Sequence, residues 1–411
     1  MAFNPMFGTR ERSCVRGAAA LAAVCSVVLF NACGGGGGGE SIPTTEIALD
    51  VAVADFNGDG LPDVAQPLMI NRNSPGVLRV NLHVPTAGKG YLPRVDYPDG
   101  VFPTRILAAS LTGGRPDLIT SSSETDFVAV RLNDPQHPGT FLAPQFLGSK
   151  FAYQVAVADM NGDGHPDLLI AGNALMVALQ NANSSGTFAA PTTFYANPSG
   201  NSFSALAVGD LNGDGVPDIV VADSYAVKVL FLGTSPQGLT VRQAVTLFTM
   251  SAGDNPAVGI ADLNGDARND VVIALPNSGT IVVLLQSGTV AGQFLPAETY
   301  QLPKGGAASL AIADLNGDGH LDLVSGEDFT VAVLLQDATH PGAFLVPTSY
   351  PAPLGADGIA VADIDGDGRL DVVTTSGVSS NLTNGTLKNI PGVLYDDPTK
   401  PGSFLPLQDL K

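Results

Sequence analysis

Six short segments of the chain place oxygen-bearing side chains at alternate positions. The segment Asp314–Asp322 reads DLNGDGHLD, with Asp at positions 1, 5 and 9, Asn at position 3 and Gly at positions 4 and 6. The pattern recurs as DFNGDGLPD (55–63), DMNGDGHPD (159–167), DLNGDGVPD (210–218), DLNGDARND (262–270) and DIDGDGRLD (363–371). A hairpin turn needs Asn-Gly or Asp-Gly, but it does not need carboxylates at alternate positions. Six copies in register therefore indicate a cation site as well as a turn, and we call these segments the acidic loops.

The oxygen-rich composition of the acidic loops favours calcium. Calcium binds six to eight carboxylate, amide and backbone oxygens, whereas magnesium demands octahedral geometry and keeps its waters, and zinc prefers Cys and His. Positions 1, 3 and 5 of a tight loop point inward together, position 7 can offer a carbonyl, and the Asp at position 9 closes the shell. The predicted ligands are Asp55, Asn57, Asp59, Asp63, Asp159, Asn161, Asp163, Asp167, Asp210, Asn212, Asp214, Asp218, Asp262, Asn264, Asp266, Asp270, Asp314, Asn316, Asp318, Asp322, Asp363, Asp365, Asp367 and Asp371.

The loops are not expected to bind equally. Ala267 replaces the second Gly of the fifth unit, and a side chain at a position that requires positive φ weakens the site. Asp365 replaces Asn in the last loop and adds a negative charge. A seventh, eroded copy, SLTGGRPD (110–117), has Ser110 and Gly114 where the other copies have Asp, so we expect no metal there.

The charge of the chain supports a structural role for the ions. The formal net charge of −20 comes from 39 acidic and 19 basic side chains, and this balance argues against nucleic acid as a partner. Nineteen of the acidic side chains are Asp at the predicted ligand positions. Without a cation, three or four carboxylates repel one another within nine residues, so calcium is expected to stabilise the fold.

A repeat of about fifty residues positions the loops. The seven copies begin at residues 55, 110, 159, 210, 262, 314 and 363. In each unit a strand of small and β-branched residues precedes the loop, and a second strand, a third strand, a Gly-x-aromatic turn and a fourth strand follow it. In the fourth unit Leu239 stands where the aromatic residue would be. Four short antiparallel strands repeated seven times predict an all-β fold, a seven-bladed β-propeller with four antiparallel strands per blade and with the calcium loops between the first and second strands of six blades.

The units resemble FG-GAP repeats, the blades of the integrin α-subunit N-terminal propeller and of many bacterial exported proteins. The resemblance covers residues 46–411 and rests on the Asp-x-Asn-x-Asp-Gly-x-x-Asp pattern, which six of the seven units carry in full or with one change. It implies a seven-bladed propeller whose loops bind calcium.

The N-terminal segment has the features of an export signal. Arg10, Arg12 and Arg16 precede a short apolar run, 18–30, which is followed by Cys33 and six glycines. We predict a signal peptide at 1–32 and a Gly-rich linker at 33–45, and the sequence before Cys33 resembles a bacterial lipoprotein signal in which that Cys becomes lipidated. Phe30 stands where such signals usually have Leu, which leaves a secreted or periplasmic protein or a retained anchor as alternatives to an outer-membrane or cell-surface lipoprotein. After cleavage Cys33 is the single Cys, so no internal disulfide can form.

Two classes of function remain for the surfaces outside the loops. We expect a monomeric binding or adhesion module that uses the face opposite the calcium loops to bind a protein or a glycan, with the membrane contacted only through a lipid anchor. The alternative is an enzyme, or an enzyme-associated propeller, that acts on extracellular polysaccharide as a lyase or a hydrolase. The sequence favours the first class, because it has no GxSxG motif and its five His lie in loops, turns and one strand rather than in an evident catalytic set.

Overall fold

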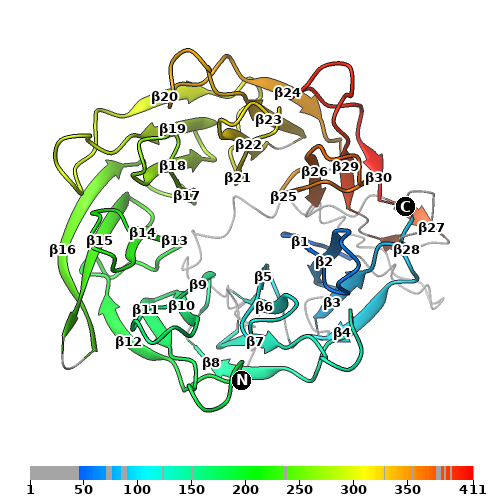
Figure 1. Cartoon of the computed structure of the whole chain (residues 1–411), viewed down its shortest axis with the longest axis horizontal. Helices are drawn as coiled ribbons and strands as arrows, with labels where there is room; N and C mark the ends of the chain where they lie inside the picture. The colour runs from blue at the N-terminus through cyan, green and yellow to red at the C-terminus, as the bar shows by residue number, and fades with distance from the viewer. Residues whose placement is uncertain are drawn as a thin grey trace, which may run out of the picture. The chain divides into compact units, whose positions relative to one another are not determined.

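The computed structural model describes residues 46–410, except for 71–75, 85–89, 101, 123–124, 150, 236–237, 328, 354, 376–380, 384–385 and 389–390. The predicted signal peptide (1–32), linker (33–45) and Cys33 lie outside these residues. The described residues form seven four-stranded antiparallel sheets and one two-stranded hairpin, and they contain no helix. No helix long and apolar enough to span a membrane occurs in this part of the chain. The predicted all-β, seven-bladed propeller is confirmed (Figure 1).

The innermost strand of each blade is short and rich in Ala and Gly. Neighbouring innermost strands contact one another around the ring, and the last contacts the first. Small side chains suit this position because seven strands converge on the centre. The innermost strands are β1 (Ala52–Ala54), β5 (Arg105–Ala109), β9 (Gln154–Ala158), β13 (Ala205–Gly209), β17 (Ala257–Ala261), β21 (Ser309–Ala313) and β25 (Gly358–Ala362).

The second strand of each blade begins at the Asp that ends the loop. These strands are buried along their whole length, which explains their runs of Val, Ile and Leu. They are β2 (Asp63–Leu68), β6 (Asp117–Ser121), β10 (Asp167–Ala171), β14 (Asp218–Ala222), β18 (Asp270–Leu275), β22 (Asp322–Gly326) and β26 (Asp371–Thr375).

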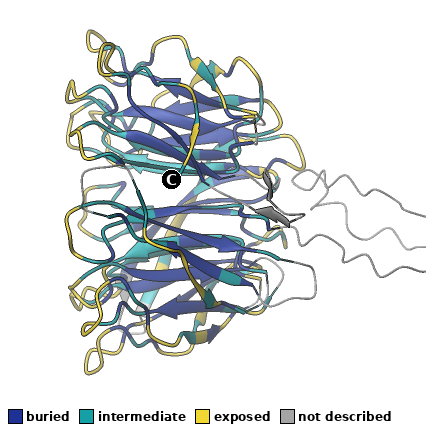
Figure 2. Cartoon of the chain, turned by 90° about the vertical axis from the view of Figure 1, so that its right-hand side faces the viewer, coloured by how far each residue is buried: buried dark blue, intermediate teal, exposed yellow. Residues whose placement is uncertain are grey.

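The third strands are mostly buried and the fourth strands form the more exposed outer edge (Figure 2). The third strands are β3 (Val77–Asn81), β7 (Phe127–Arg131), β11 (Ala174–Ala178), β15 (Ala226–Ser235), β19 (Thr280–Leu284), β23 (Thr330–Leu334) and β29 (Gly392–Leu394). The fourth strands are β4 (Val95–Pro98), β8 (Gln145–Gly148), β12 (Thr192–Ala196), β16 (Gly238–Thr249), β20 (Glu298–Gln301), β24 (Thr348–Pro351) and β30 (Gln408–Asp409).

Two blades depart from the common plan. In the fourth blade, β15 and β16 form one long hairpin in place of the Gly-x-aromatic turn, and Leu239 pairs with Thr234 inside it. The seventh blade carries an additional hairpin, β27 (Asn381–Thr383) and β28 (Thr386–Lys388), between its second and third strands.

The hydrophobic core is divided among the interfaces between neighbouring blades, which we call seams. In one cluster Val220 and Val229 of the fourth blade pack with Ile273 and Val282 of the fifth. The seam between the seventh and first blades closes the ring. There the cluster includes Val51 of the first blade, and β1 contacts β25. All four strands of each of these two blades come from one end of the chain, so among the described residues the ring closes by side-chain packing without exchange of a strand.

Candidate metal centres

Each acidic loop joins the first strand of a blade to its second strand. In the fifth blade the last residue of β17, Ala261, pairs with Asp270, so the loop between them is a closed turn. Positions 4 and 6 have positive φ in all six loops, which explains the two glycines of the pattern. Ala267 occupies position 6 of its loop with φ 64, the strained conformation that its place in the sequence predicts.

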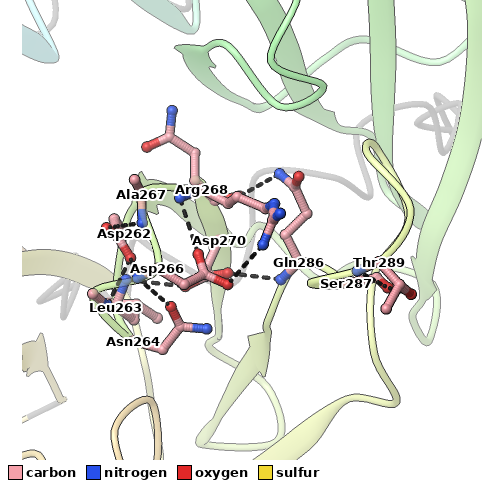
Figure 3. A network of polar contacts seen from close by, with 12 residues as sticks. Asp262, Leu263, Asn264, Asp266, Ala267, Arg268, Asp270, Gln286, Ser287 and Thr289 are labelled. Carbon is pink, nitrogen blue, oxygen red and sulfur yellow. Dashed lines mark hydrogen bonds and ion pairs between the residues drawn. The ribbon is translucent and has the colours of Figure 1, made fainter.

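The first Asp of each loop organises the backbone around its carboxylate (Figure 3). Asp262 accepts hydrogen bonds from the backbone N–H groups of Gly265 at 2.8 Å, Asp266 at 3.1 Å and Ala267 at 2.8 Å. The N–H of position 6 donates to the first Asp in all six loops. Hydrogen bonds from the loop backbone alone therefore hold the loop around the carboxylate of its first Asp.

The Asp at position 9 is a buried structural residue. One carboxylate oxygen of Asp270 accepts the N–H of Leu263 at 3.0 Å, and the other accepts the N–H of Gln286 at 2.7 Å. Asp117 in the eroded copy makes the same two contacts, with Leu111 at 2.9 Å and Asn133 at 2.7 Å. This role was missed by sequence reasoning, although the retention of Asp117 where the other acids are lost was a signal for it.

Burial and neighbouring carboxylates raise the pKa of the Asp at position 9. Desolvation is the main cause, and in all six loops the carboxylates of other loop positions add to it. The pKa rises to about 6 for Asp270 and to about 7 for Asp371. In the eroded copy the pKa of Asp117 is raised by burial alone, without an acidic neighbour. A divalent cation would relieve this repulsion, so the donor set of the acidic loops fits calcium.

The structure brings some predicted ligands together more closely than others. In the last loop, carboxylate oxygens of Asp363, Asp365 and Asp371 lie within 4.8 Å of one another. The carboxylate at position 5 accepts the N–H of position 7 in all six loops, as Asp266 accepts that of Arg268 at 3.0 Å. The Asn at position 3 donates its side-chain amide to the Asp at position 5 in three loops, at 3.0 Å in each.

The eroded copy closes on itself without a carboxylate cluster. The hydroxyl of Ser110 donates to the carbonyl of Gly114 at 2.9 Å. Arg115 extends to the base of the outer turn, where it donates to Asn133 Oδ1 at 3.2 Å and to the carbonyl of Asp134 at 2.9 Å. We still predict that this loop holds no metal, because hydrogen bonds already join its ends.

Amide side chains link three of the loops to the next blade, those of the first, second and fourth blades. Gln286, which follows β19, donates to the carbonyl of Leu211 in the preceding blade at 2.9 Å and to that of Asn269 in its own blade at 3.0 Å. Gln180 and Asn133 make the corresponding contacts with Leu111 and Phe56, at 3.1 Å and 2.7 Å. These seam amides were not identified from the sequence, although the repeated Gln after the third strand was visible.

The Gly of the Gly-x-aromatic turn also contacts the preceding loop. A Cβ added to Gly342 would lie 3.3 Å from Cβ of Asn264, at position 3 of the loop in the neighbouring blade, and 2.8 Å from a methyl group of Leu285. Gly139 and Gly402 lie in the same way against Asn57 and Asn316. These three acidic loops therefore form part of a seam, and their shape affects the packing of two blades.

Comparisons with known proteins agree with this architecture. The FG-GAP-like repeat matches residues 114–170, 159–221, 262–325 and 314–374, which together make up more than half of the chain. Human integrin alpha-7 is 31% identical over 162 residues, which cover 33% of this chain and 13% of the integrin. The chain thus spans only a small part of that relative.

Two solved structures cover most of the chain at low sequence identity. Sqt1 from Chaetomium thermophilum is 13% identical, with a TM-score of 0.51 and coverage of 90% of each chain. A protein from Lactobacillus plantarum is 16% identical, with a TM-score of 0.47 and coverage of 89% of this chain and 96% of its own. The similarity to Sqt1 shows a shared fold and nothing more. The match to the FG-GAP-like repeat shows the family. The chain belongs to the FG-GAP-like repeat family.

Proposed function

We propose that this protein is an exported binding module whose acidic loops hold calcium as structural ions. The observation that carries the proposal is the buried Asp at position 9. Burial and the neighbouring loop carboxylates raise the pKa of Asp63, Asp218, Asp270 and Asp322 to about 6. A calcium ion in each loop would neutralise this repulsion and hold the loop against the next blade.

The face opposite the acidic loops is the proposed binding surface. The turns between second and third strands and the connections between blades lie on that face, and they differ from one blade to the next. In the fourth blade, for example, Tyr225 in such a turn is 52% exposed, and in the sixth Phe329 is 62% exposed. The similarity to an integrin alpha chain and the signal-like N-terminal sequence support a binding role outside the cell, anchored through Cys33 if that residue is lipidated.

Calcium binding is tested directly by equilibrium dialysis of the purified chain, with the bound metal measured by elemental analysis. We expect about six calcium ions per chain and little replacement by magnesium at equal concentration. A chain that retains no calcium would contradict the proposal. Screening against glycan and matrix-protein arrays then tests the binding role, and turnover of a polysaccharide would favour the enzymatic alternative.

A further inference from the structure

A small polar pocket lies at the end of the blades remote from the acidic loops. Its volume is ≈ 70 Å³, and its polar lining consists of Asp50, Arg105, Ser121 and Gln154. Arg105 and Gln154 are the first residues of β5 and β9, Ser121 is the last residue of β6, and Asp50 precedes β1. The acidic loops follow the other ends of β1 and β9, so the pocket opens on the proposed binding face, where the first three blades meet.

The polar groups of the pocket are incompletely satisfied by the described part of the chain. Ser121 is 3% exposed, and its hydroxyl has no hydrogen-bond partner among the described residues. Within the same residues, the guanidinium of Arg105 makes no hydrogen bond or direct ion pair and interacts with Asp50 only at longer range. A buried hydroxyl and a cation that both face a cavity normally have a partner, and a ligand would supply one.

Asp50 is held in place by the backbone of two blades. Its carboxylate accepts the N–H of Val51 and that of Ile106, each at 3.0 Å. One oxygen is thereby tied to the first blade and the other to the second. The pocket therefore presents a positioned carboxyl group, whose pKa is raised by burial in spite of nearby Arg105, with Ile106 and Ile119 among its apolar walls.

Backbone strain occurs near the pocket in the second and third blades, two of the three blades that line it. Phe102 and Phe151, each three residues before Arg105 and Gln154, have φ 56 and φ 52. Ala267 is the other non-glycine residue with positive φ among the described residues. Strain of this kind persists where a functional geometry requires it, and here it occurs at equivalent places on one face.

We propose that this pocket binds a small carboxylate that bears a hydrogen-bond donor, a hydroxyl or an ammonium group, on the neighbouring carbon. The guanidinium of Arg105 suits a carboxylate, which it can hold through two parallel hydrogen bonds. Asp50 accepts the neighbouring donor, and Ser121 and Gln154 complete the contacts. A water needs about 10–15 Å³ of such volume, so the pocket holds only a few heavy atoms and takes this group rather than a whole sugar ring. The group could belong to a free acid or to the end of a larger molecule.

The inference deepens the proposed binding function and rests on it. Isothermal titration of the calcium-loaded full chain would compare glycolate and glycine with acetate, which lacks the donor, and with ethylene glycol, which lacks the carboxylate. We expect glycolate or glycine to bind at least tenfold more tightly than either control compound. Which of the two binds identifies the donor, hydroxyl or ammonium. Equal binding of acetate, or no binding of glycolate and glycine, would overturn the assignment.

Matched variants connect the binding to the pocket. Arg105→Gln is expected to abolish binding, and Ser121→Ala to weaken it several-fold with the fold intact, since that hydroxyl has no partner in the described structure. Arg94→Gln removes the same charge from an exposed residue before β4 and should leave binding unchanged. Binding by Arg105→Gln equal to that of the unmodified chain would contradict the proposal.

The binding module and the pocket assignment can be contradicted independently of each other. If a partner found on the arrays binds Arg105→Gln as well as the unmodified chain, and glycolate and glycine do not bind, the binding module stands and the pocket assignment falls. If glycolate or glycine binds through Arg105 and the arrays detect no partner, the pocket assignment stands and the adhesion role falls.

Discussion

At the scale of single residues, the Asp at position 9 determines how the metal-free protein responds to pH. Its pKa in the folded state, about 6 for Asp270 and about 7 for Asp371, lies above the ordinary value of 3.8 because of burial and neighbouring carboxylates. A raised pKa means that the folded state favours the protonated form. The resulting stability is fully present below pH 3.8 and is lost as the pH rises through 6 to 7.

We therefore predict that the calcium-free chain unfolds at a higher temperature at pH 5 than at pH 8. Thermal unfolding followed by circular dichroism, after removal of calcium by chelation and gel filtration, measures this difference. The calcium-loaded chain serves as the control, and it should show the opposite trend, with a lower unfolding temperature at pH 5 than at pH 8, because protons compete with the ion for the carboxylates. A calcium-free chain that is less stable at pH 5 would show that other groups dominate.

Ala267 provides a second test at the residue scale. Its φ of 64 costs an L-residue about 1 kcal/mol relative to Gly. Ala267→Gly should therefore stabilise the calcium-loaded protein by about that amount, and Gly215→Ala, at the equivalent position of the fourth blade, should destabilise it similarly. A Cβ on Gly215 meets no atom within 4 Å, so the second variant reports strain without a clash. Chemical denaturation measures both, and effects of equal sign would contradict the assignment.

At the scale of elements, the seam amides join one blade to the loop of the one before it. Gln286 is 3% exposed and donates to two backbone carbonyls, that of Leu211 in the preceding blade and that of Asn269 in its own. Gln286→Ala leaves both acceptors without their donor in a buried site, and we predict a loss of about 2 kcal/mol in the free energy of unfolding.

Gln301 offers a matched control for this prediction. Its side-chain amide also donates to two carbonyls, those of Ser278 and Gly279, at 2.9 Å each, but it lies on the exposed outer strand β20 of the same blade. Gln301→Ala should change stability by less than about 0.5 kcal/mol, since water replaces the lost donor. If both variants lose the same free energy of unfolding in urea denaturation, the seam contact of Gln286 contributes no more to stability than an exposed contact does.

Much of the element plan could be predicted from the sequence, because each strand and loop has a local signature. The loop pattern locates both the end of each first strand and the start of each second strand, as at Ala261 and Asp270. The long hairpin of the fourth blade was harder to predict from the sequence, because only the missing aromatic residue at Leu239 indicated a change. The seam amides depend on contacts between residues about 75 positions apart, such as Gln286 and Leu211, and no local pattern shows which carbonyl they meet.

At the scale of the whole molecule, closure of the ring is the point at which the repeat is least regular. Among the described residues, the chain ends of the propeller meet there without an exchanged strand. At this seam His83 occupies the place that an amide occupies in other blades, and Asp396 occupies the same place at the seam between the sixth and seventh blades, where it pairs with Arg369. An ion pair therefore replaces the neutral amide contact at the seam before the closure, so the stability of that seam depends more on charge.

The central claim is that calcium in the acidic loops stabilises the whole propeller. Ions that bind only the folded state stabilise it by roughly 3 kcal/mol per site at a hundredfold excess over Kd. Thermal unfolding of the full chain, measured by calorimetry at pH 7.5 in excess calcium and again after chelation, tests the claim most directly. We predict a large fall in the unfolding temperature on chelation and its recovery on adding calcium but not magnesium. An unfolding temperature that is the same with and without calcium would contradict the account.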